Sequence, residues 1–226
     1  MDAKIITIDG PAAAGKSTVA RAVSGRLGFA YVDSGALYRI VTWQARVRGV
    51  PTDDPVALAS LVETLEIDFP VRDGAVNYAV AGVVPGVEIR TPEVNAHVSP
   101  VSREPVVRDR VTAWLRGLRA LGNLVVEGRD IGTVVFPESP ARFYLDAAPE
   151  ARARRRLAEE QARGLHQAED AVLNSILNRD RIDSTRKAAP LRIPEGAVVI
   201  DTTPLTVEGV IEAILARLPP GYVPAR

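Results

Sequence analysis

Short apolar runs alternate along this chain with longer stretches of helical composition. Residues 5–9 form an apolar run of strand length, and residues 19–27 behind it have the composition of a helix. Four further runs of strand length follow, each with helix signals behind it, at residues 29–33, 123–127, 141–146 and 197–201. Five strands that alternate with helices predict an α/β fold of three layers, doubly wound around a five-stranded parallel sheet.

Residues 66–88 interrupt this alternation. Their short alternating segments at 67–69 and 76–78 are separated by the turn signal Asp73-Gly74, and Pro85-Gly86 marks another turn. The pattern predicts a small antiparallel sheet, inserted between two strands of the parallel sheet and belonging to a separate lobe.

The remaining stretches predict the helices. Residues 36–47 follow Ser34, a good N-cap residue, and Thr91-Pro92 opens a short helix. Residues 102–121 have the pattern of one long amphipathic helix. Two arginine-bearing helices at 149–163 and 168–183 are joined by a short connection, which indicates a lid that closes on phosphates.

Composition narrows the class of protein. The chain has 226 residues with 28 basic and 28 acidic side chains, so no overall positive charge favours nucleic-acid binding. It has no cysteine, which excludes disulfides and thiolate metal sites. No apolar run approaches the roughly 18 residues of a membrane span, and no export signal precedes the first strand. We therefore expect a cytoplasmic protein without a membrane or nucleic-acid partner. We take it to be a monomer, although the sequence leaves the oligomeric state open.

The clearest motif follows the first strand directly. Gly-x-x-x-x-Gly-Lys-Ser begins at Gly10, and its glycines let the loop curl so that N–H groups converge on a polyphosphate. Lys16 supplies a charge between the β- and γ-phosphates, and Ser17 supplies a hydroxyl for Mg²⁺. The alternative, a surface turn with a solvated lysine, is disfavoured by the flanking strand and helix. The predicted ATP-binding residues are Gly10, Pro11, Ala12, Ala13, Ala14, Gly15, Lys16, Ser17 and Thr18.

Charged residues mark the edge of the sheet where this loop lies. Asp9, Asp33 and Glu127 stand at the ends of three predicted strands, and Arg129 and Asp130 follow the last of these. The carboxyl ends of parallel strands meet at the edge that binds ligands. The chain shows neither a serine–histidine spacing typical of a nucleophile nor a Gly-x-Ser-x-Gly motif. An arginine-rich edge without a general base suits phosphoryl transfer to an acceptor that is already ionised, such as a nucleoside monophosphate.

The two lid helices carry further charges in register. Arg179, Asp183 and Arg186 are spaced so that one helical face holds all three. Arg152, Arg155 and Arg156 share a face by the same spacing. Such stripes are either solvated ion pairs of little energetic value or an anion-binding face. The spacing alone leaves both interpretations open.

Taken in chain order, these motifs resemble those of the bacterial cytidylate kinase family. The most specific blocks contain Asp33-Ser34-Gly35 and Gly128-Arg129-Asp130. The matching blocks are residues 8–11, 33–39, 88–91, 127–137 and 179–186. The chain departs from the family pattern at Glu127, where many members have aspartate, and in its run of three alanines at residues 12–14, where a glycine is common.

The resemblance implies an enzyme that transfers the γ-phosphate of ATP, with Mg²⁺, to CMP or dCMP. It implies a P-loop core, a monophosphate-binding lobe and a lid, which are residues 1–35, 105–150 and 187–226, residues 36–104, and residues 151–186 respectively. The implied catalytic residues are Lys16, Arg129, Arg155, Arg156 and Arg186. The implied CMP-binding residues are Arg39, Arg129 and Arg186 for the phosphate with Ser34 and Tyr38 nearby, Arg179 and Asp183 for the sugar, and Ser99, Arg108 and Asp130 for the base.

Several points stay open at the level of sequence. The carboxylate that completes the Mg²⁺ shell with Ser17 is Asp9, Asp33 or Glu127. The choice between CMP and dCMP, the tolerance of UMP and the resting position of the lid are also undetermined. The alternatives in function are another kinase on the same core, with a thymidylate, adenylate or shikimate acceptor, and a nucleotide-dependent switch protein that ignores CMP.

Overall fold

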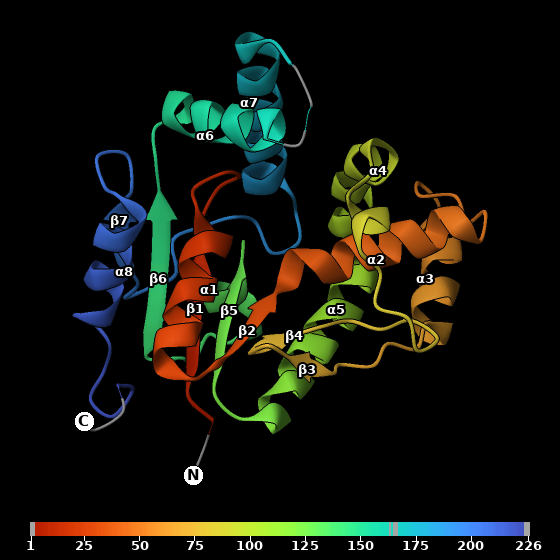
Figure 1. Ribbon diagram of the computed structural model, residues 1–226. Coiled ribbons are helices and arrows are strands. Elements are labelled where there is room, and N and C mark those ends of the chain that lie inside the picture. The colour runs from red at the N-terminus through yellow and green to blue at the C-terminus, as the bar shows by residue number, and fades with distance from the viewer. Residues whose placement is uncertain (1–2, 163, 165–166, 224–226) are drawn as a thin grey trace.

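Seven strands of the described part of the chain form a single sheet at the centre of the molecule. The structure, a computed structural model, describes residues 3–162, 164 and 167–223. The sheet has the order β3-β4-β2-β5-β1-β6-β7 (Figure 1). Its parallel core consists of β1 (Ile5–Asp9), β2 (Ala30–Asp33), β5 (Leu124–Gly128), β6 (Ala141–Asp146) and β7 (Val198–Asp201). The predicted five-stranded parallel sheet is confirmed.

The predicted antiparallel hairpin is present, but it continues the main sheet. Strands β3 (Val71–Arg72) and β4 (Ala75–Val76) pair antiparallel with each other. Strand β4 also pairs parallel with β2 through Tyr31 and Ala75, and the Tyr31 N–H donates to the Gly74 carbonyl at 2.8 Å. The expectation of a separate small sheet is therefore wrong, because the open edge of β2 offers the hairpin main-chain hydrogen bonds.

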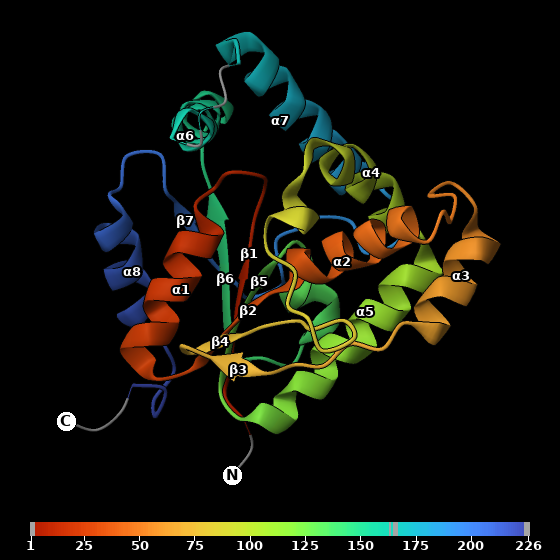
Figure 2. The ribbon, with the colours of Figure 1, turned by 45° about the vertical axis from the view of Figure 1, so that its right-hand side comes forward.

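Helices cover both faces of the sheet. Figure 2 shows α1 (Lys16–Leu27) and α8 (Val207–Leu215) on one side, and α2 (Ser34–Val47), α3 (Pro55–Thr64) and α5 (Pro105–Gly117) on the other. Strand β1 is buried on both faces: Ile5 packs in one hydrophobic core, and Ile6 and Ile8 pack in the other. A continuous apolar run is what a central parallel strand requires, which explains the first pattern in the sequence.

Two helices stand above the carboxyl edge of the sheet, where a lid is predicted. They are α6 (Pro149–Gln161) and α7 (Glu169–Thr185) (Figure 1). The two helices share a small core of Ala153, Val172 and Ile176. The predicted end of the first lid helix, at residue 163, lies outside the described residues. No helix of the described chain is long and apolar enough to cross a membrane.

The predicted helix over residues 102–121 is divided in two. Helix α4 (Pro92–Arg103) ends just before Glu104, whose backbone is extended, and α5 begins at Pro105. A residue before proline is pushed out of the helical conformation, which explains the break. Helix α5 is followed by the 3₁₀ helix η2 (Leu118–Leu121), and a further 3₁₀ helix, η1 (Val87–Arg90), precedes α4.

Helix α2 begins two residues before the predicted range of residues 36–47, and its N-cap lies one residue earlier than predicted. Asp33 is its N-cap residue, and the Asp33 carboxylate accepts a hydrogen bond from the Ala36 N–H at 3.1 Å. Ser34 lies inside the helix, and its hydroxyl donates to the Glu127 carbonyl at 2.6 Å. The prediction of Ser34 as N-cap is therefore wrong, and its side chain connects α2 to the end of β5.

Candidate functional site

One cavity lies at the carboxyl edge of the sheet, between the P-loop, α2, α4 and α7. Six basic and four acidic side chains line it, so its surface carries an excess of positive charge. Most of the residues predicted for catalysis and CMP binding meet there, although they come from segments far apart in the chain. The predicted site residues that line it are Ala13, Lys16, Ser17, Ser34, Tyr38, Arg39, Ser99, Arg129, Asp130, Arg179, Asp183 and Arg186.

The P-loop forms one end of the cavity. An added Cβ at Gly10 would lie 2.1 Å from the Leu145 carbonyl oxygen, so only glycine lets the loop pass this close to β6. Lys16 is buried, and its Nζ donates to the Pro11 carbonyl at 2.7 Å. Burial and the neighbouring Arg129 charge lower the pKa of Lys16 to about 7. A bound anion would therefore strongly stabilise the protonated form of this buried amine.

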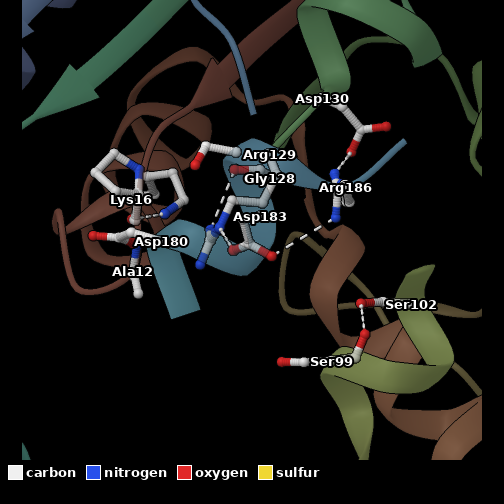
Figure 3. Close-up of polar contacts among 12 residues, drawn as sticks. Ala12, Lys16, Ser99, Ser102, Gly128, Arg129, Asp130, Asp180, Asp183 and Arg186 are labelled. Carbon is white, nitrogen blue, oxygen red and sulfur yellow. Dashed lines mark hydrogen bonds and ion pairs between the residues drawn. The ribbon is translucent and has the colours of Figure 1, made fainter. Parts of the chain in front are cut away.

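Asp180 and Arg152 attach the lid helices to this loop, although neither is among the predicted catalytic or binding residues. The Ala12 N–H donates to the Asp180 carboxylate at 3.2 Å (Figure 3). Asp180 also forms an ion pair with Arg152 at 2.5 Å. Arg152 is buried and also donates to the carbonyls of Ala12 and Ala147. These contacts bring α6 and α7 against the first half of the loop.

Ser17 lies beside one of the three candidate carboxylates. Its hydroxyl donates to Glu127, and the Tyr31 hydroxyl donates to the same oxygen of Glu127 at 3.1 Å. Burial and the nearby Asp33 charge raise the pKa of Glu127. Asp33 caps α2 and pairs with Arg90 at 3.1 Å, while both carboxylate oxygens of Asp9 accept main-chain hydrogen bonds. Of the three candidate carboxylates, Glu127 is therefore the one that lies next to the Ser17 hydroxyl.

A network of arginines and carboxylates forms the other end of the cavity. Asp130 binds Arg108 through one oxygen and Arg186 through the other, the latter at 3.4 Å. Arg108 lies behind Asp130, where it also donates to the Ser102 carbonyl and stacks 5.3 Å from the Tyr38 ring. All four groups are buried or nearly so, so the carboxylate of Asp130 is held in one orientation at the cavity wall.

Arg129 and Asp183 connect the two ends of the cavity (Figure 3). The Arg129 Nε donates to Asp183 at 2.9 Å, and Arg186 lies 3.8 Å from the other oxygen of Asp183. Burial alone would raise the pKa of Asp183, but Arg129 and Arg179 hold it below its ordinary value. The buried carboxylate is therefore ionised and fixes the arginines around it.

Within the described part of the chain, Arg179 and Arg39 have fewer anionic partners than Arg129 and Arg186. The Nε of Arg179 is buried and has no hydrogen-bond partner among the described residues. Burial and the Arg129 charge lower the pKa of Arg179 to about 10, and burial and the Arg179 charge lower that of Arg39 to about 10. Arg39 donates to Asn95 at 2.6 Å and to the Ile89 carbonyl. Both guanidinium groups stay charged at neutral pH and would be stabilised by a bound anion.

Two predicted catalytic residues lie outside the cavity lining. Arg155 donates to the main chain and side chain of Thr202, and Arg156 pairs with Glu160 on its own helix. The charge of Arg156 nevertheless helps to lower the pKa values of Arg39 and Arg179, so it lies close enough to affect the site. Arg90 lines the cavity without having been singled out, although it lies within the block at residues 88–91.

Solved structures similar to this chain support the fold. TT1252 from Thermus thermophilus has a TM-score of 0.50 at 20% identity and covers 97% of this chain and all of its own. An uncharacterized protein from Eubacterium ventriosum has a TM-score of 0.53 at 10% identity, with 94% of this chain and 96% of its own covered. At these identities the likeness concerns the architecture alone.

Sequence comparison is more specific. The cytidylate kinase of Pelotomaculum thermopropionicum is 43% identical over 217 residues, which is 96% of each chain, and that of Geobacillus sp. is 42% identical with 93% and 94% covered. A bifunctional pantoate ligase/cytidylate kinase of Prochlorococcus marinus is 44% identical over 93% of this chain, which spans 42% of that longer relative. The family model described as cytidylate kinase matches residues 6–219. With the P-loop and the arginine network at one edge of its sheet, this chain belongs to the cytidylate kinase family.

Proposed function

We propose that this chain is a cytidylate kinase, which transfers the γ-phosphate of ATP to CMP or dCMP and releases ADP with CDP or dCDP. The observation that carries the proposal is a single cavity with two kinds of anion site. One end is a P-loop with a buried lysine, and the other holds Arg39, Arg129 and Arg186. The γ-phosphate of ATP would bind at the first end and the phosphate of CMP at the second, so that the two groups come together for transfer.

In this proposal residues 10–18 bind the phosphates of ATP. Lys16 would leave the Pro11 carbonyl for the β- and γ-phosphates, since a phosphate is a stronger partner than a neutral carbonyl. Mg²⁺, when bound, neutralises charge on the same phosphates. Ser17 would hold it, and the contact between Ser17 and Glu127 makes Glu127 the carboxylate that we assign to its shell.

The acceptor would occupy the arginine-rich end. We assign the CMP phosphate to Arg39, Arg129 and Arg186, with Ser34 and Tyr38 beside them, and the sugar to Arg179 and Asp183. The base would meet Ser99 and Asp130, with Arg108 behind the carboxylate. An ionised aspartate accepts a hydrogen bond from the exocyclic amine of cytosine, whereas uracil has a carbonyl at that position.

The chemistry needs alignment and charge neutralisation rather than a base. The acceptor phosphate is ionised at neutral pH, so the protein has no proton to remove before in-line transfer. Lys16, Arg129 and Arg186 would stabilise charge on the transferred group. We assign the same role to Arg155 and Arg156 of the lid, which requires their contacts with Thr202 and Glu160 to be exchanged when the lid closes.

We also propose which segments move when the substrates bind, and where in the cell the enzyme acts. Residues 36–104 would close on the acceptor, apart from the β3–β4 hairpin that pairs with β2, and residues 151–186 would close on ATP. The core of residues 1–35, 105–150 and 187–226 would stay fixed. Closure would exclude water, so that ATP is not hydrolysed when no acceptor is bound. The enzyme would act in the cytoplasm, where ATP and cytidine nucleotides meet. It would act as a monomer, since the residues that we assign to both anion sites belong to one chain.

A panel of acceptors tests the proposed function. The rate of ADP release with ATP and Mg²⁺ is measured with CMP, dCMP, UMP, AMP, dTMP and shikimate in a coupled assay. We expect fastest turnover with CMP or dCMP. Fastest turnover with another acceptor would contradict the proposal, and failure to bind CMP at equilibrium would favour a nucleotide-dependent switch.

Asp130→Asn should weaken discrimination between CMP and UMP by about 10- to 100-fold. Asparagine keeps the shape of the side chain, but its amide can turn either a donor or an acceptor toward the base, so uracil is no longer rejected. The ratio of kcat/KM for CMP over UMP measures the effect. A ratio equal to that of the wild type would contradict the role of Asp130.

Nucleotide binding should depend on pH through Lys16. Below about pH 7 its amine is already protonated, whereas above that pH a bound phosphate must draw a proton onto it. Affinity for a nonhydrolysable ATP analogue with Mg²⁺ should therefore fall as pH rises above 7, by up to about tenfold per pH unit. Calorimetry near pH 8 in buffers of different ionisation enthalpy should show uptake of nearly one proton, and Lys16→Gln should abolish that uptake.

A further inference from the structure

Asp9 is the last residue of β1 and directly precedes Gly10 of the P-loop. Its side chain is fully buried and does not line the cavity. One carboxylate oxygen accepts a hydrogen bond from the Ile131 N–H at 2.8 Å, and the other accepts one from the Gly132 N–H at 2.7 Å. Both oxygens are thus used by main-chain donors that lie more than a hundred residues further along the chain.

These two amides are the first of η3 (Ile131–Val135), a short π-helix that begins directly after Asp130. A helix usually starts with a side chain of its own N-cap residue that accepts a hydrogen bond from one of the first amides. Asp130 is the N-cap residue of η3, but its side chain makes no such bond and binds Arg108 and Arg186 instead. Asp9 caps the helix in its place, which leaves the carboxylate of Asp130 available at the cavity wall.

The segment around Asp130 has little room to move against β1. A Cβ at Gly132 would lie 2.9 Å from the Thr7 hydroxyl oxygen and 3.2 Å from an oxygen of Asp9. A Cβ at Gly128 would lie 2.5 Å from the hydroxyl oxygen of Ser34. Two glycines therefore allow close contact on either side of Asp130, and the bonds to Asp9 fix where that contact is made.

We propose that Asp9 is a positioning residue for base recognition. By holding the amides of Ile131 and Gly132, it sets the place at which the carboxylate of Asp130 meets the cytosine amine. This inference rests on the proposed function, in which Asp130 reads the base. It also gives β1 a double role, because the strand that leads into the ATP loop fixes the specificity site for the acceptor.

The test compares Asp9→Asn with a matched control on the same strand. Asparagine has the size of aspartate but only one acceptor oxygen, so its NH₂ group would face one of the two amides and displace it. The control is Thr7→Val, because the Thr7 hydroxyl is buried beside Gly132 and has no hydrogen-bond partner among the described residues. Valine keeps its shape and removes no bond.

The measured quantity is the ratio of kcat/KM for CMP over UMP. We expect Asp9→Asn to lower this ratio by about tenfold, mainly through a higher KM for CMP, while KM for ATP changes by less than about twofold. Thr7→Val should keep the wild-type ratio. A purely structural role would lower the melting temperature and the rates with CMP and UMP alike, so an unchanged ratio in Asp9→Asn would overturn the inference.

A second variant perturbs the same contact from the opposite side. Gly132→Ala places a methyl group against Thr7 and Asp9 and should also lower the ratio, and this variant decides the question if Asp9→Asn does not fold. An unchanged ratio in Gly132→Ala would then overturn the inference. A wild-type enzyme without preference for CMP over UMP would instead refute the proposed function, so the two failures are distinguishable.

Discussion

Replacing Lys16 by glutamine should lower kcat with ATP and CMP by about a thousandfold. Lys16 is the buried cation of the P-loop, and glutamine can keep a hydrogen bond to the Pro11 carbonyl while it loses the charge. The lost interaction grows as charge builds on the transferred phosphoryl group, so kcat should suffer more than the affinity for ATP. Steady-state kinetics with saturating CMP and Mg²⁺ measure this change.

The control for this prediction is another lysine of the three in the chain. Lys4 precedes β1, at the end of the strand opposite the P-loop, so Lys4→Gln should keep the wild-type kcat. CMP binding, measured by calorimetry without ATP, should be unaffected in Lys16→Gln. More than about a tenth of wild-type turnover in Lys16→Gln would show that the backbone amides of the loop suffice without the charge.

Replacing Arg186 by glutamine should lower kcat/KM for CMP by about 100- to 1,000-fold. Arg186 is buried and contacts both Asp130 and Asp183. Under the proposed function, its loss would remove a phosphate ligand and loosen the base and sugar sites together. Asp130 keeps Arg108 as partner, and Asp183 keeps Arg129. The free energy of unfolding should therefore fall by only about 1–3 kcal/mol, less than for a buried carboxylate left unpaired.

The matched control for Arg186 lies on the same segment. Arg181 of α7 is exposed and bonds to Asn178 of the same helix, so Arg181→Gln should change neither activity nor stability appreciably. Kinetics with CMP and urea unfolding measure the two effects for both variants. Loss of activity in proportion to loss of folded protein would contradict a direct role for Arg186 in binding the acceptor.

Much of the fold could be predicted because its signals are local. The apolar run of residues 5–9, the glycines of the P-loop and the turn at Asp73-Gly74 each act within a few residues. Thr91 and Pro92 start α4 as predicted, and the Thr91 hydroxyl accepts a hydrogen bond from the Val94 N–H. Such signals depend on the backbone angles that single residues allow, so they can be recognised before any tertiary contact exists.

The errors arose where two signals competed. Residues 102–121 have a helical pattern, but Pro105 ends the first helix and starts the second. Asp33 and Ser34 are both good caps, and the choice between them depends on Glu127, whose carbonyl accepts the Ser34 hydroxyl. The spacing of apolar residues could not decide either case. It is the same for one helix as for two over residues 102–121, and the same whether Asp33 or Ser34 is the N-cap.

Some features of the candidate site follow from the sequence, and others follow only from the tertiary structure. The sequence by itself determined that a P-loop follows a buried strand and that arginines and carboxylates stand at strand ends and on one helical face, because these follow from residue type and spacing. Only the tertiary structure decided which charges meet: Arg186 lies between Asp130 and Asp183, Arg155 turns to Thr202, and Asp9 holds the amides after Asp130. Most of these partners lie far apart in the sequence. Their pairing depends on how the helices and strands pack against one another, and the spacing of residues along the chain does not specify that packing.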